Sequence, residues 1–97
     1  MCNINQAKEL AKWTPFELGE SNRKEAIHYL ILYLATGNGN EKRLAASAIS
    51  KLTENFKESC VLAVPYLLAN LSHSMPQVRQ YTLKSLNLLD LFTLEKA

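Results

Sequence analysis

Residues 26–52 read AIHYLILYLATGNGNEKRLAASAISKL, and residues 63–89 read AVPYLLANLSHSMPQVRQYTLKSLNLL. The two stretches align without a gap at a shift of 37 residues. Apolar residues then align with apolar residues, as Ile31 does with Leu68. The identical pairs are Ala26/Ala63, Tyr29/Tyr66, Leu30/Leu67, Leu34/Leu71 and Leu52/Leu89. A period of this size is typical of stacked repeats, in which each unit buries its apolar face against its neighbours.

The composition is that of one ordinary globular domain. The chain has 97 residues, of which 47% are hydrophobic and 21% charged, and this length allows a modest core. The net charge of +2 alone does not predict a nucleic-acid partner. The polar N-terminus lacks a secretory pattern, and the longest apolar run, 26–35, is too short to cross a bilayer. Cys2 and Cys60 are far apart, so we expect two reduced thiols in a cytoplasmic protein.

The apolar spacing predicts an all-α chain of about five helices and no strand. The expected spans are 4–13, 22–35, 41–55, 59–71 and 76–92, with one helical turn at 14–17 inside a loop. Helix starts are predicted where a side chain can cap the first backbone N–H groups. The predicted caps are Thr14, Asn22, Asn40, Ser59 and Ser74. Proline costs little in the first turn of a helix, so Pro65 leaves open a start of the fourth helix nearer Val61 than Ser59.

Three segments resemble HEAT-type repeats of the PBS-lyase-like kind, within the HEAT/armadillo class. Residues 76–86, PQVRQYTLKSL, and 40–49, NEKRLAASAI, are similar to the first helix of such a repeat, and 63–68, AVPYLL, to the start of its second. The resemblance implies a right-handed α-solenoid of helical hairpins. Its repeats would be about 4–36 and 40–73, with a half repeat at 76–92. That last helix would lack its hairpin partner, so we expect a fragment of a longer protein or a small closed array.

No pattern of residues predicts catalysis, a metal or a cofactor. His28 and His73 lie 45 positions apart, and no Cys or His stands at metal-ligand spacing to either. Asp90 is the only aspartate, so no Ser-His-Asp arrangement can be named. Residues 37–39, Gly-Asn-Gly, follow a predicted helix and not a strand, which indicates a helix end and not a phosphate loop.

The expected function is that of a non-catalytic scaffold that binds another protein. In a stacked-repeat architecture the second helices of the hairpins form one continuous surface. The predicted interaction face consists of Lys24, His28, Leu32, Ala69, Asn70 and His73.

The alternative is an accessory nucleic-acid-contacting module of a larger enzyme such as a helicase. Stacking would bring Lys42 over Arg79, because they match at the 37-residue shift, and Arg43 would extend this basic ridge. Such a ridge can contact phosphates. Nearby glutamates, including Glu41 and Glu54, dilute its charge, so protein binding is the favoured interpretation.

The end of the chain predicts a second surface. Val78, Thr82 and Leu89 mark the stripe of the last helix that should face the preceding repeat. A further apolar set would stay uncovered, and it consists of Tyr81, Leu88, Leu91 and Phe92. Uncovered apolar patches usually mark interfaces. We therefore expect either self-association through the last helix or a tail that folds back over Leu88 and Phe92.

Overall fold

The computed structural model describes the backbone of residues 10–96 and the side chains of residues 10–89. This part of the chain is helical and contains no strand. Its elements are α2 (Pro15–Glu20), α3 (Ala26–Thr36), α4 (Gly39–Cys60), the 3₁₀ turn η1 (Val61–Ala63), α5 (Val64–Ala69), the 3₁₀ turn η2 (Asn70–Ser72) and α6 (Pro76–Lys96). None of the helices described is both long and apolar enough to pass through a bilayer. The predicted helix at 4–13 lies largely outside the described residues, although residues 10–12 are helical.

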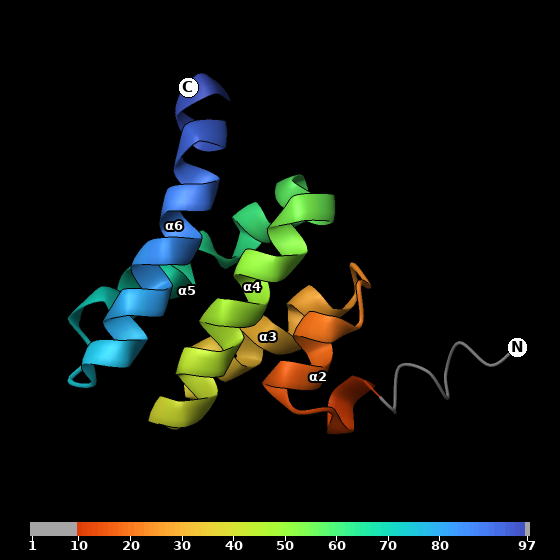
Figure 1. Cartoon of the computed structure of the whole chain (residues 1–97), viewed down its shortest axis with the longest axis vertical. Helices are drawn as coiled ribbons and strands as arrows, with labels where there is room; N and C mark the ends of the chain where they lie inside the picture. Colours follow the sequence, from red (N-terminus) through yellow and green to blue (C-terminus); the bar gives the residue numbers. More distant parts are fainter. Residues whose placement is uncertain (1–9, 97) are drawn as a thin grey trace, which may run out of the picture.

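The helices form two layers (Figure 1). Helices α2, α4 and α6 lie side by side, and α3 and α5 lie behind them. Helix α4 is central because it contacts α2, α3 and α6, and its contact with α6 is the most extensive between any two elements. Helices α4 and α6 run in the same direction in Figure 1. The two longest helices are therefore neighbours in one layer.

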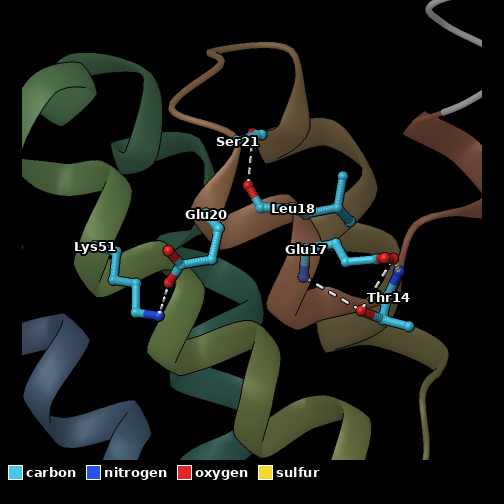
Figure 2. A network of polar contacts seen from close by, with 6 residues as sticks. All are labelled: Thr14, Glu17, Leu18, Glu20, Ser21 and Lys51. Atoms are coloured by element: carbon cyan, nitrogen blue, oxygen red, sulfur yellow. Dashed lines mark hydrogen bonds and ion pairs between the residues drawn. The ribbon is translucent and has the colours of Figure 1, made fainter.

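The start of α2 confirms one predicted cap. The hydroxyl of Thr14 accepts a hydrogen bond from the backbone N–H of Glu17 at 3.2 Å, and the Glu17 carboxylate accepts one from the N–H of Thr14 at 2.9 Å (Figure 2). This reciprocal pair is a capping box, and Pro15 adds a fixed helical φ. The predicted single turn is a six-residue helix that packs on α4, where a Cβ added at Gly19 would lie 2.7 Å from the Cβ of Ala48.

Two other predicted caps are wrong. Asn38, and not Asn40, caps α4, because its side chain lies three residues before Glu41 and can accept from the N–H of Glu41 at 2.9 Å. Asn22 does not cap α3, which begins at Ala26 without a side-chain cap. The backbone of Asn22 takes a φ of 53°, and its side-chain oxygen accepts a hydrogen bond from Asn55 of α4.

The segment after α4 is less regular than predicted. Phe56 has a non-helical φ of −132° and ψ of 46°, which agrees with a predicted helix end near Asn55, but the chain then continues helically to Cys60. Ser59 therefore lies within a helix and is not a cap. Pro65 sits in the first turn of α5, as predicted. The predicted helix 59–71 is in fact η1, α5 and η2 in succession.

The core includes equivalent positions of the two stretches that align at the 37-residue shift. Both members of three identical pairs are at most 1% exposed, namely Ala26/Ala63, Leu30/Leu67 and Leu52/Leu89. Between α4 and α6 the contact is partly polar, because the hydroxyls of Ser50 and Ser85 lie 2.8 Å apart and Ser85 also bonds to the carbonyl of Ala46. Small residues at this contact allow close approach of the two helices.

Candidate functional site

Several apolar side chains of α3 and of the segment from η1 to α5 are exposed to solvent. Leu32 of α3 is 59% exposed, and Leu62 of η1 is 57% exposed. Tyr66 is 40% exposed, and Ala69 is also exposed. We call Leu32, Leu62, Tyr66 and Ala69, together with the exposed His28, the outer face. Leu32 and Ala69 come two positions after the buried Leu30 and Leu67, which places them on the opposite side of α3 and α5 from the core.

A pocket of about 180 Å³ links the two parts of the outer face. It lies where the start of α3 meets the end of α4 and the turn η1, and it is lined by Lys24, Glu25, Ile27, His28, Ser59 and Leu62. Two predicted residues, Lys24 and His28, therefore come together with Leu62, which the sequence did not single out. Its lining combines the apolar Ile27 and Leu62 with the charged Lys24 and Glu25, which suits an apolar side chain with polar neighbours.

The six residues predicted for the interaction face differ in exposure. Lys24, His28, Leu32 and Ala69 are exposed. Asn70, however, is only 4% exposed, so its prediction as a surface residue is wrong. Its carboxamide donates a hydrogen bond to the carbonyl of Leu34 at 3.2 Å and so ties η2 to the end of α3. A buried amide is tolerated because it has this partner.

His73 is half-buried and serves the turn before α6. Its Nδ1 accepts a hydrogen bond from the backbone N–H of Met75 at 3.0 Å, which meets one of the unpaired donors at the helix start. The carbonyl of His73 accepts a bond from Arg79 at 2.7 Å. The side chain of His73 thus has a structural role at this turn. His28, by contrast, is exposed on α3.

The predicted basic ridge is not a free cationic surface. Lys42, Arg43 and Arg79 are all half-buried. The guanidinium of Arg79 donates to the carbonyls of His73 and Ser74, and the Nε of Arg43 is buried without a hydrogen-bond partner. Phosphate contacts need cationic groups that reach solvent. These three side chains are therefore less available to contact phosphates than the sequence pattern indicates.

The residues predicted to form the surface at the end of the chain differ in exposure. Tyr81 is half-buried and packs against the core, whereas Leu88 is 43% exposed. The side chains of Leu91 and Phe92 lie outside the described residues. Helix α6 continues to Lys96, so the tail does not fold back over the last helix, and that alternative is wrong. The sequence did not single out Leu83, which is 51% exposed on the same helix.

The described residues hold no group of three or more His, Cys, Asp or Glu side chains that could bind a metal ion. Cys60 is fully buried, and burial raises the pKa of its thiol, which a hydrogen bond with Thr53 lowers in part. A raised thiol pKa leaves little thiolate for nucleophilic chemistry.

Comparison with protein-family models, with curated proteins and with solved structures found no match.

Proposed function

We propose that this chain is a non-catalytic protein-interaction module built as a HEAT-like α-solenoid. The observation that carries the proposal is the outer face, where Leu32 and Leu62 are each more than half exposed and Tyr66 is 40% exposed. Isolated exposed leucines are ordinary, but several apolar residues gathered on one face indicate a surface that a partner covers.

The contacts between equivalent elements support the solenoid arrangement. Helices α4 and α6 are the matching helices at the 37-residue shift, and they form the most extensive contact in the described part of the chain. Helices α3 and α5, which match each other at the same shift, also touch. Stacking of like on like is the defining contact of a repeat protein. In such an array α3 and α5 share one side, which is where the outer face lies.

The chemistry of the outer face specifies the kind of partner. It includes the exposed Tyr66, an aromatic residue type that is enriched at protein interfaces. Lys24 and Glu25 at the edge of the pocket offer one charge of each sign. A partner with an apolar side chain for the pocket and polar groups around it would match this surface.

Affinity capture from cells with the wild-type chain and two variants tests the proposal. We expect Leu32→Lys/Leu62→Lys to lose the proteins that the wild type retains, because two charges would be buried in the apolar contact. Leu83→Lys is the matched control, because Leu83 is 51% exposed but lies on α6. Equal retention by the wild type and by Leu32→Lys/Leu62→Lys would show that the outer face binds no partner.

A further inference from the structure

A pocket of about 370 Å³ lies along the exposed side of α2. The residues that line it follow one another at helical spacing, and they are Trp13, Phe16, Glu17, Glu20 and Ser21. Trp13 is half-buried, whereas Phe16 is 55% exposed. Two aromatic rings and two carboxylates therefore share one pocket, and none of the five lining residues carries a positive charge.

The aromatic and the acidic groups of this pocket both attract cations. A positive group is attracted to the face of an aromatic ring, most strongly to that of tryptophan, and carboxylates form strong hydrogen bonds with charged donors. The chain itself shows this combination beside the pocket. The ammonium of Lys51 lies 4.7 Å from the centroid of the Phe16 ring and also pairs with the Glu20 carboxylate (Figure 2).

Both carboxylates keep acceptor capacity for a further cation. Glu17 uses its Oε1 atom to accept from Thr14, and Glu20 uses its Oε2 atom to accept from Lys51. The other oxygen of each carboxylate has no hydrogen-bond partner among the residues that the structure describes. Lys51 compensates the charge of Glu20, whereas Glu17 forms no ion pair with a described side chain. One negative charge at the pocket is therefore uncompensated.

We propose that this pocket, which we call the cation pocket, binds an arginine side chain of a partner protein. A flat guanidinium can stack on an aromatic ring while its in-plane N–H groups donate to a carboxylate, which the compact ammonium of lysine cannot do. Glu17 is the expected acceptor because it has no ion pair, and Glu20 adds negative charge. The inference goes beyond the proposed function, because the cation pocket lies on α2 and depends neither on the repeat arrangement nor on the outer face.

The fluorescence of Trp13 tests the proposal in the full chain, because Trp13 is the only tryptophan and lines the cation pocket. The probe is a tripeptide of glycine, arginine and glycine with both ends blocked. Matched probes carry lysine, or the neutral arginine analogue citrulline, at the central position. We expect the arginine peptide to change the emission of Trp13 with a dissociation constant on the order of 1 mM. The citrulline and lysine peptides should bind about tenfold more weakly.

Variants of single residues locate the binding. Glu17→Gln removes the charge of the expected acceptor but keeps the cap of α2, because glutamine also serves at this position of a capping box. It should weaken binding of the arginine peptide about tenfold. Glu54→Gln is the control, because it removes the same charge from an exposed position on α4 and should bind like the wild type. Lys51→Gln should bind more tightly, because it removes a competing positive charge beside Phe16.

Several outcomes would overturn the proposal. One is an unchanged emission of Trp13 with up to about 20 mM of the arginine peptide. Equal binding of the arginine peptide and either matched peptide would show that the guanidinium is not recognised. Equal binding by the wild type and Glu17→Gln would show that Glu17 is not the acceptor. Failure of the proposed function is scored separately, by partner capture through the outer face.

Discussion

At the scale of single residues, Leu67 tests whether the two copies bury the same positions. Leu67 and its equivalent Leu30 are both 0% exposed. Replacing Leu67 with Ala should lower the free energy of unfolding by roughly 2–5 kcal/mol, through lost burial and the cavity left behind. Leu68→Ala is the control, because Leu68 is 52% exposed and should cost much less. Denaturant unfolding measures both, and a Leu67→Ala chain that melts within about a degree of the wild type would refute the repeat register.

Cys60 makes stability depend on pH at the alkaline end. Burial raises the pKa of its thiol above the ordinary value of 9.0, so the folded chain holds the thiol proton more tightly than the unfolded chain. The stabilisation is complete below about pH 9 and is lost as pH rises through the folded-state value. Between about pH 8 and pH 10, Cys2→Ser should therefore lose more unfolding free energy than Cys2→Ser/Cys60→Ala. Other titrating groups are common to both chains, so equal losses would mean that Cys60 does not contribute.

At the scale of secondary structure elements, the start of α4 depends on one side chain. The side chain of Asn38 accepts a hydrogen bond from the N–H of Glu41, and the Glu41 carboxylate accepts one from the N–H of Asn38, both at 2.9 Å. Asn38→Ala should cost about 1 kcal/mol of unfolding free energy. Asn40→Ala tests the other possible cap and should change stability by less than about 0.5 kcal/mol, because Asn40 is an exposed residue in the first turn. Thermal unfolding measures both variants. If Asn40→Ala lowered the melting temperature more than Asn38→Ala, α4 would start at the later residue.

Local patterns in the sequence predicted the helices and their buried stripes, because these depend on spacing along one element. The choice between Asn38 and Asn40 was missed because both asparagines precede the same acidic residue, and only the distance to Glu41 decides between them. The irregular segment that follows Phe56 has no clear sequence signal apart from Pro65.

The candidate surfaces were harder to predict than the helices, because exposure depends on contacts between distant residues. Leu32 was predicted on the interaction face, and it is exposed. Asn70 was placed there as well, but its partner, Leu34, lies 36 positions earlier in the chain. Leu83 was missed because only the contact between α4 and α6 shows which side of α6 remains open.

At the scale of the whole molecule, the distribution of cations predicts weak binding of nucleic acid. Arg79 is engaged with backbone carbonyls, and Lys42 and Arg43 are half-buried. We therefore expect no shift when tens of micromolar protein is titrated against labelled duplex or single-stranded DNA at low salt. Binding that weakens steeply with salt would instead indicate released counterions and a phosphate-contacting surface. If Lys42→Gln then lost that binding, the basic ridge would be the surface that contacts the phosphates.

The central claim is that α4 and α6, the equivalent helices of two repeat copies, lie against each other at Ser50 and Ser85. Their hydroxyls are 2.8 Å apart, close enough for cysteines at these positions to form a disulfide. The most direct measurement is the rate of oxidation of Ser50→Cys/Ser85→Cys in a chain that also carries Cys2→Ser and Cys60→Ala. We predict rapid intramolecular cross-linking, and none for Ser50→Cys/Lys84→Cys, because Lys84 is exposed on another side of α6. Cross-linking of the Lys84 pair but not of the Ser85 pair would contradict the stacking of α4 on α6.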